Sequence, residues 1–430
     1  MDHFSQQAHS PYEQAQTLDD LSTGLQLVRI LLILGHHQQA CDAYRGDLAI
    51  ALLFKVEAHV EVLALLRPLF LEGWATVTGE VTEDDAGYVL NAAAIALRAS
   101  GEFGHALAAN EATLRMSLLQ KAWADVGIVL TNTAHTYASL NCLASEARCR
   151  LLALEITEIS GEKHLFSARL ERFWQLTRIG KYLEAEALWR VLDAMGFENA
   201  IHFYRPGEAE WYHGEFLFRQ GLLQEQHLSK AEGLAQAGNA RAVIRYLHRL
   251  RGKWRLRQAR ETADYAAAAR SLGEAVRMAH EVRLSDPEAE TLLALARLHQ
   301  GVLEDSRALA GQLASANRYH PLALSELWLA IAKREVDAVT AASDRERARD
   351  FALKAYRQAW ANGEPYVQRH ELERATDLLR ELGAEVPVLP PYDATKAEKF
   401  AWEDEVMAAI AELRREKEIR DAEAGGESGW

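Results

Sequence analysis

The residues with the clearest capacity for chemistry are eight basic side chains between positions 241 and 260. This segment contains no acidic residue, and Tyr246 and Trp254 are interleaved with its charges. Guanidinium groups beside aromatic rings are typical of surfaces that bind phosphates or stack on bases. The pattern predicts a site for an anionic ligand or a nucleic acid. Its candidate residues are Arg241, Arg245, Arg249, Arg251, Lys253, Trp254, Arg255, Arg257 and Arg260.

A second interpretation of the same segment is a long helix whose charges are neutralised within the protein. Acidic residues at 208–215 and 286–290 could supply the partners, and runs of like charge usually form such neutralised or solvated faces. The whole chain has 48 basic and 62 acidic residues, a formal charge of −14. This acidic balance argues against non-specific wrapping of nucleic acid by the whole surface.

Other residue pairs could in principle bind a metal or transfer a proton. His36 and His37 lie near Cys41, but His37 occupies a position where other segments have an aromatic packing residue. Glu57 and Glu61 lie four residues apart, and we expect both to face solvent on a helix. The sequence has no phosphate-binding glycine loop, zinc-protease motif or nucleophile elbow. We therefore expect no metal, no cofactor and no enzymatic activity.

The elements that position these residues follow from an internal repeat. An apolar helix ends in Gly, an aromatic or apolar residue follows two positions later, and Ala stands three positions beyond it. Gly provides the positive φ that ends the first helix, and Ala lets two helices approach closely. A copy with Asn141 in place of Gly leads to Ala147. The clearest copies are Gly35-His-His37-Gln-Gln-Ala40, Gly101-Glu-Phe103-Gly-His-Ala106 and Gly180-Lys-Tyr182-Leu-Glu-Ala185.

These motifs resemble tetratricopeptide (TPR) repeats over roughly residues 17–385. The equivalent residues Ala106, Ala147 and Ala185 are 41 and 38 residues apart, whereas a standard TPR has about 34 residues. The longer period is similar to that of divergent arrays in bacterial regulatory and sensor proteins. The resemblance implies an all-α fold: a right-handed TPR-like superhelical solenoid of about eight antiparallel hairpins with a C-terminal capping helix. We expect an additional helical segment between Ala49 and Trp74, broken near Pro68.

The resemblance also implies a groove for an extended peptide. Asn91 and Asn132 are 41 residues apart on expected first helices, and they resemble the asparagines with which TPR-like proteins hold a peptide backbone. The alternative is that both are solvated polar positions without a ligand.

The chain divides into five expected regions. These are a polar N-terminal segment (1–16), the solenoid (17–385), a Pro-rich linker (386–393), an amphipathic helix (394–423) and a disordered tail (424–430). One face of the C-terminal helix carries Trp402, Val406, Ile410 and Leu413. That face is expected either to cap the last repeat or to dock on a partner.

The composition predicts a cytoplasmic protein that binds other macromolecules. Three cysteines are too few for a disulfide framework, and neither a signal peptide nor a membrane span is evident. A solenoid presents a large surface for recognition, so the leading hypothesis is a scaffold, adaptor or sensor subunit with a protein or peptide partner. The resemblance to bacterial arrays implies a signalling or defence complex. The alternative is a nucleic-acid- or anion-binding subunit that uses residues 241–260.

Overall fold

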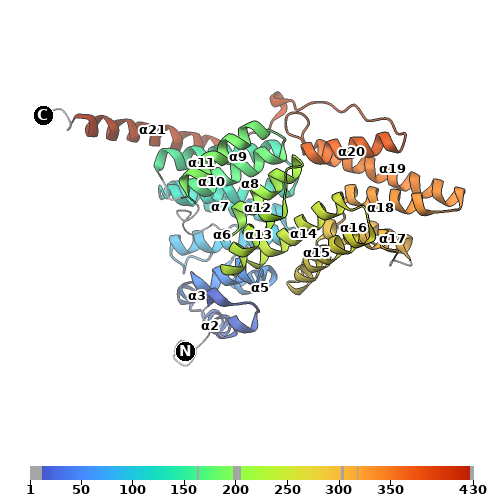
Figure 1. Cartoon of the computed structure of the whole chain (residues 1–430). Coiled ribbons are helices and arrows are strands. Elements are labelled where there is room, and N and C mark those ends of the chain that lie inside the picture. Colours follow the sequence, from blue (N-terminus) through green and yellow to red (C-terminus); the bar gives the residue numbers. More distant parts are fainter. Residues whose placement is uncertain (1–11, 162–163, 197–204, 302–304, 317, 427–430) are drawn as a thin grey trace. The chain divides into compact units, whose positions relative to one another are not determined.

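A computed structural model describes residues 12–161, 164–196, 205–301, 305–316 and 318–426. Within these residues all regular structure is helical, apart from two isolated β-bridges. Most helices form hairpins with short turns, and Figure 1 shows them following one another in chain order. The hairpins, first helix before second, are α2 (Ser22–Ile33) and α3 (His37–Tyr44), α6 (Glu83–Ser100) and α7 (Phe103–Leu119), α8 (Trp123–Ser139) and α9 (Leu143–Ser160), α10 (Leu165–Arg178) and α11 (Tyr182–Met195), α12 (Glu208–Arg219) and α13 (Glu225–Ala237), α14 (Arg241–Gln258) and α15 (Thr262–Glu281), α16 (Pro287–His299) and α17 (Ser306–Ser315), and α18 (Pro321–Arg334) and α19 (Ala338–Trp360).

The turn residues of the repeat have the backbone conformation that the sequence predicts. Gly35, Gly101 and Gly180 have φ values of 74°, 86° and 78°, and Asn141 has a φ of 60°. The alanines that follow them are buried at helix–helix contacts, with Ala106 fully inaccessible to solvent. The sequence therefore placed the hairpin turns correctly, because only Gly and Asn adopt this conformation readily.

Irregular helices separate the first two hairpins. They comprise α4 (Asp47–Ile50), a π-helical turn (Ala51–Lys55) and α5 (His59–Leu66), followed by a 3₁₀ turn at Arg67–Leu69. The predicted break near Pro68 is confirmed. The expectation that Glu57 faces solvent is wrong: the residue is 8% exposed, has a φ of 52° and lies between two helices. The π-helical turn shifts the backbone register and turns this side chain inward.

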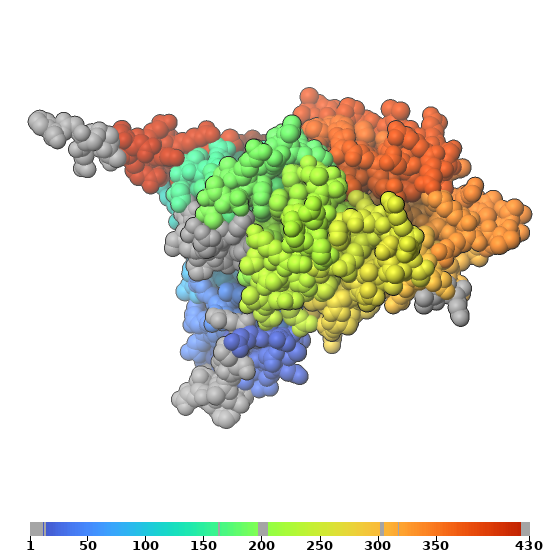
Figure 2. All heavy atoms as spheres, viewed as in Figure 1, coloured from blue at the N-terminus to red at the C-terminus, as the bar shows by residue number. Residues whose placement is uncertain are grey.

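The chain forms two compact units. Unit 1 contains residues 1–175, 184–204 and 393–430, and unit 2 contains residues 176–183 and 205–392. Unit 1 has apolar clusters between α2 and α7 and around α8 and α9, whereas one apolar cluster of unit 2 extends from α15 to α20 (Arg369–Glu381). Side chains of successive hairpins in unit 2 fill the spaces between the ribbons (Figure 2).

The Pro-rich segment after α20 packs on unit 2 rather than extending away from it. Trp360 Nε1 donates to the carbonyl of Pro390 at 2.9 Å, and Tyr392 N donates to the carbonyl of Glu364 at 3.1 Å. A short 3₁₀ turn at Ala394–Lys396 follows, capped by Asp393. The C-terminal helix α21 (Glu403–Gly426) therefore begins nine residues after the expected position 394.

The apolar face of α21 packs within unit 1, against α7 and α9. The structure thus departs from both expectations for this face, a cap on the last repeat and a partner-docking surface. The chain's own apolar side chains, including Leu114, Val129 and Ile156, occupy it. Lys121 Nζ also pairs with Glu412 at 2.5 Å. The four face residues are at most 5% exposed, and they are Trp402, Val406, Ile410 and Leu413.

The end of α21 also differs from the expected boundaries. The helix continues to Gly426, into the segment 424–430 that was expected to be disordered. Residues 427–430, and residues 1–11 of the predicted N-terminal segment, lie outside the described residues. Across the described part of the chain, each helix is too short or too polar to cross a bilayer.

Candidate functional site

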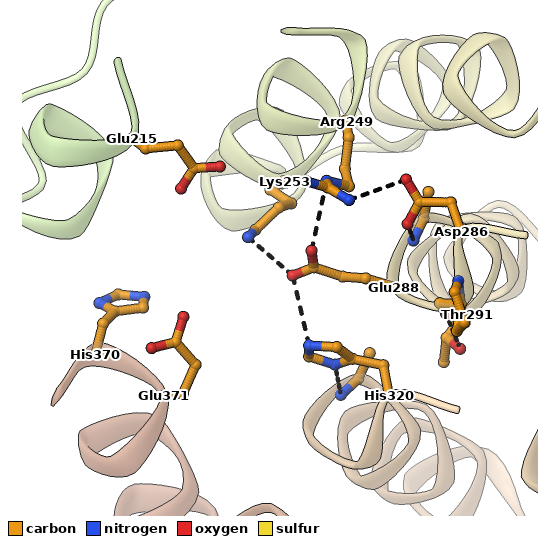
Figure 3. Close-up of polar contacts among 12 residues, drawn as sticks. Glu215, Arg249, Lys253, Asp286, Glu288, Thr291, His320, His370 and Glu371 are labelled. Carbon is orange, nitrogen blue, oxygen red and sulfur yellow. Dashed lines mark hydrogen bonds and ion pairs between the residues drawn. The ribbon is translucent and has the colours of Figure 1, made fainter. Parts of the chain in front are cut away.

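Charged and ionisable side chains converge on one side of unit 2, on the first helices of its hairpins and on α20. Figure 3 shows most of them, directed toward one another from α12, α14, α16, α18 and α20. We refer to this group as the charge cluster. It comprises Glu215, Arg219, Arg249, Lys253, Arg257, Asp286, Glu288, His320, His370 and Glu371.

The start of α16 fixes two acidic members of the cluster. Asp286 is the N-cap residue, and its Oδ1 accepts from Ala289 N at 3.1 Å. Pro287 follows as the first helical residue, where its missing N–H and fixed φ are favourable. Glu288 is then in the first turn, where the helix dipole stabilises a negative charge. The local sequence Asp-Pro-Glu therefore directs two carboxylates toward α14.

Basic side chains from α14 meet these carboxylates. Arg249 Nη1 lies 3.0 Å from Asp286 Oδ2, and Arg249 Nε lies 3.6 Å from Glu288 Oε2. Lys253 Nζ contacts Glu288 Oε1 at 2.8 Å. His320 caps α18 by accepting from Ala323 N through Nδ1, which leaves its Nε2 to face Glu288 Oε1 at 3.8 Å. One carboxylate is therefore approached from α14 and α18 at once (Figure 3).

A second group of the cluster joins α12 to α20. Arg219 Nη1 donates to both oxygens of Glu371, at 2.8 and 3.0 Å. His370 lies beside Glu371 on α20, and its ring contacts Phe218 with centroids 5.8 Å apart. One guanidinium nitrogen thus contacts both carboxylate oxygens, in a charge-assisted pair that joins α12 to α20.

The protonation properties of the cluster reflect burial opposed by nearby charges. Burial alone would raise the pKa of Glu371, but Arg219, His370 and Lys253 lower it to about 2. Glu288 behaves in the same way, since Lys253, His320 and Arg249 hold its pKa far below the usual range. Burial lowers the pKa of His370 to about 3. Glu288 and Glu371 nevertheless keep 19% and 22% of their side chains exposed, so water reaches the cluster.

No known protein family model matches this chain. No curated protein is similar to it either.

The structure neutralises most of the basic segment that the sequence singles out. Five of its side chains pair with carboxylates inside unit 2, and the pairs are Arg241 with Glu281, Arg249 with Asp286, Arg251 with Glu225 and Glu232, Lys253 with Glu288, and Arg255 with Glu225. Arg245 is buried beside Tyr246, and Trp254 is partly buried with no hydrogen bond at its indole N–H. Arg260 is exposed. Of the expected acidic segments, 286–290 supplies Asp286 and Glu288. The remaining carboxylate partners, Glu225, Glu232 and Glu281, come from α13 and α15, which the sequence did not indicate.

Arg257 differs from the other cations of the cluster because it has no carboxylate partner within ion-pair distance among the described residues. Its guanidinium lies 4.0 Å above the ring of Phe218 and contacts Nε2 of His370. The side chain is exposed, yet surrounding protein lowers its pKa, and Arg374 and Arg219 add to that effect. Arg257 is thus crowded by other cations while water and solutes still reach it.

Glu215 is the corresponding exception among the acids. The residue is 3% exposed, and its Oε2 has no hydrogen-bond partner in the described part of the chain. The nearby Arg219 Nη2 lies 3.8 Å from that oxygen, beyond hydrogen-bond distance. Figure 3 shows the Glu215 carboxylate directed into the charge cluster.

In unit 1, the two asparagines that the sequence singles out contact each other. Asn132 Nδ2 on α8 donates to Asn91 Oδ1 on α6 at 2.8 Å. Further polar groups follow on the first helices α8 and α10, where His135 Nε2 lies 3.3 Å from Glu171. Both asparagines are half-buried, so each retains amide groups that water or a ligand can reach.

Sequence reasoning did not identify Arg219, Glu371, His370 or Glu215 as members of a site. Arg219 and Glu371 are 152 residues apart, and neither lies in a recognisable motif. The available signal was weak: Glu371 and His370 lie at the start of an amphipathic helix, as many surface residues do. Only the packing of α20 beside α18 and α12 brings them together.

Proposed function

We propose that this chain is a TPR-like solenoid of about eight hairpins that binds a protein or peptide segment without catalysing a reaction. The positive φ values at the hairpin turns, the buried alanines and the packing of neighbouring hairpins within each unit, such as α7 on α8 and α15 on α16, support the fold part of this proposal. The bound segment would lie along the first helices, as in an adaptor, scaffold or sensor subunit.

The observation that carries the proposal is the placement of polar groups on the first helices of unit 2. These side chains are partly desolvated although the apolar core already holds the helices together. Partly buried charges stabilise a fold poorly compared with apolar residues of similar size. Their retention on successive first helices, within reach of water, favours a role in recognition.

Unit 1, taken by itself, offers a separate candidate contact for a peptide. A carboxamide can donate to a backbone carbonyl and accept from a backbone N–H, so Asn91 and Asn132 suit the main chain of a peptide. The charge cluster of unit 2 instead suits charged side chains.

We do not extend the proposal to nucleic acid. Five of the basic side chains at 241–260 already contact carboxylates of unit 2. A polynucleotide needs many unpaired cations to replace its counterions. Two exposed cations, Arg257 and Arg260, are too few for that purpose.

The test is capture of partners from cells that naturally contain the protein. Tagged wild-type protein is compared with an Asn91→Ala/Asn132→Ala variant, with washes at low and high salt. We expect a protein partner that survives the high-salt wash and is reduced at least tenfold by the double substitution. Folding should be preserved, because removing both members of a hydrogen bond leaves no buried group unpaired.

The matched control replaces two amides on the second-helix side, Gln120→Ala with Gln226→Ala. Both residues are exposed and lie outside the first helices. Equal loss of the partner in both double variants would contradict recognition by the first helices. Recovery of nucleic acid that is released by salt would favour the alternative function at residues 241–260.

A further inference from the structure

Two members of the charge cluster, of opposite sign, are less completely paired than the others. Glu215 is almost completely buried, its Oε2 accepts no hydrogen bond, and the ion pair of that oxygen with Arg219 is 3.8 Å long. Arg257 contacts His370 but has no carboxylate within ion-pair distance in the described part of the chain. A buried carboxylate oxygen without a hydrogen bond is costly, so such atoms in native proteins call for an explanation.

We propose that the charge cluster binds a peptide segment bearing a basic and an acidic side chain, with the basic group on Glu215 and the acidic group on Arg257. This inference rests on the proposed function, because it names the class of segment that the first helices of unit 2 recognise. The basic group donates N–H bonds to the unpaired oxygen of Glu215. The acidic group accepts from the Arg257 donors that His370 does not use.

The positions of the two groups fit such a segment. Glu215 precedes Phe218 by three residues on α12, and Arg257 lies over the ring of Phe218. The two charges are therefore offset by about one helical turn, about 5 Å along α12. In an extended peptide, alternate side chains lie on one face about 7 Å apart. A flexible lysine or arginine side chain can accommodate the difference.

The environment of Arg257 favours a carboxylate over a phosphate. Phe218 covers one face of the guanidinium and His370 accepts from its edge, which orients the remaining donors. Glu371 and Glu326 also act on Arg257 at longer range. These carboxylates would repel a phosphate dianion more strongly than a single carboxylate.

The principal experiment uses four pools of random eight-residue peptides with amidated C-termini. The first pool includes both Lys/Arg and Asp/Glu among its residues. The second includes Lys/Arg as its only charged residues, and the third includes Asp/Glu as its only charged residues. In the fourth pool, Gln and Asn replace all charged residues. Retention on the immobilised full-length protein is measured by mass spectrometry at low salt. We expect the mixed-charge pool to be retained at least tenfold more than each of the others.

Two substitutions assign the charges and a third serves as the control. Glu215→Gln should reduce retention of the mixed pool about tenfold, to that of the acidic pool. Arg257→Gln should reduce it to that of the basic pool. Arg255→Gln is the matched control, because it removes an arginine of the same helix that pairs with Glu225. It should change retention less than twofold.

The outcomes distinguish this inference from the proposed function. Equal retention of all four pools, or a mixed-charge preference that survives both substitutions, overturns the inference and leaves peptide binding intact. Retention of no pool counts against the proposed function. In that case small probes decide the inference, with thermal unfolding measured at constant ionic strength.

In this second measurement, methylammonium chloride and sodium acetate each replace sodium chloride at about 0.1 M. We expect methylammonium to raise the Tm of the wild type by about 2 °C more than that of Glu215→Gln, and acetate to raise it by about 2 °C more than that of Arg257→Gln. Methylammonium should lose its effect in Glu215→Gln, and acetate should lose its effect in Arg257→Gln. Equal shifts in wild type and variants overturn the inference, as does a larger Arg257-dependent shift with inorganic phosphate than with acetate.

Discussion

Arg249 and Arg257 lie two helical turns apart on α14 but have different electrostatic surroundings. Arg249 faces Asp286 and Glu288, and these charges hold its pKa well above the usual value despite burial. Arg257 faces an aromatic ring and a histidine, and its pKa is lowered. Substitutions of these two arginines on one helix are thus expected to change stability by different amounts.

We predict that Arg249→Gln lowers the free energy of unfolding by about 2 kcal/mol, because two desolvated carboxylates lose a partner. The side chain is 23% exposed, so the loss is smaller than that for a fully buried pair. Arg257→Gln should change stability by less than about 1 kcal/mol in either direction, because no carboxylate loses a partner. Urea titrations of the two variants at pH 7 provide the measurement. Equal destabilisation would contradict this assignment.

The histidine and the acid at the start of α20 predict a loss of stability in acid. The ordinary pKa of His370 is 6.5, and it falls to about 3 in the folded protein. The unfolded chain therefore binds this proton more readily, so stability is full above pH 6.5 and falls as the pH decreases toward 3. For Glu371 the pKa falls from 4.5 to about 2, so its contribution is lost between those pH values.

We predict that His370→Gln reduces the loss of unfolding free energy between pH 7 and pH 5 by about 2 kcal/mol. Arg219, Lys253, Arg257 and Glu371 face His370 from α12, α14 and α20. Part of the loss should remain, because burial also lowers the pKa of His135, His248 and His299. Urea titrations at pH 8, 7, 6 and 5 test this. A variant that parallels the wild type throughout would show that His370 does not contribute.

At the scale of elements, close packing between helices depends on particular glycines. Gly252 lies within α14, where an added Cβ would stand 2.5 Å from Leu272 Cγ and 3.2 Å from Leu272 N on α15. Gly273 lies within α15, with no neighbouring atom within 4 Å of such a Cβ. The first glycine permits contact between two helices, whereas the second lies in open space.

We predict opposite effects of alanine at these two glycines. Gly252→Ala should lower the free energy of unfolding by about 1–3 kcal/mol, since overpacking outweighs the gain in helix propensity. Gly273→Ala should raise it by about 0.5–1 kcal/mol, because only the propensity changes. Thermal unfolding of the two variants distinguishes these effects. A stabilised Gly252→Ala protein would show that α14 and α15 can separate without loss.

At the scale of the whole molecule, the two compact units predict separate responses to substitution. The sequence alone favours one body, because a repeat array buries its apolar faces continuously. Contacts within the folded chain instead divide it near Gln175 and again at Tyr392. Helix α21, at the end of the sequence, belongs with residues of the first half.

We predict that Trp402→Ala increases hydrogen exchange in α7, α9 and α21 of unit 1, with little change in α14–α20. Removing a large buried side chain costs about 3–5 kcal/mol locally. Arg249→Gln should show the reverse pattern. Hydrogen exchange followed by mass spectrometry measures both variants. Uniform acceleration throughout the chain in either variant would indicate a single cooperative body.

Sequence patterns anticipated local features of the fold more successfully than the site. Gly35, Gly101, Gly180 and Asn141 marked the turns, because positive φ restricts the residue type at each position separately. The repeat placed Asn91 and Asn132 at equivalent positions of two first helices, but their contact with each other is seen only in the structure. The position of α21 could not be predicted in this way, since many apolar surfaces would accept its amphipathic face.

The sequence by itself determined the helical character, the hairpin turns and the presence of a concentrated basic segment. These properties depend on residues close together along the chain. Only the tertiary structure decided which charges are neutralised and which remain. Arg219 meets Glu371 across 152 residues, whereas Arg257 has no acidic partner within ion-pair distance in the described structure. The physical reason is that electrostatic energy depends on separation and burial in space, which local sequence does not specify.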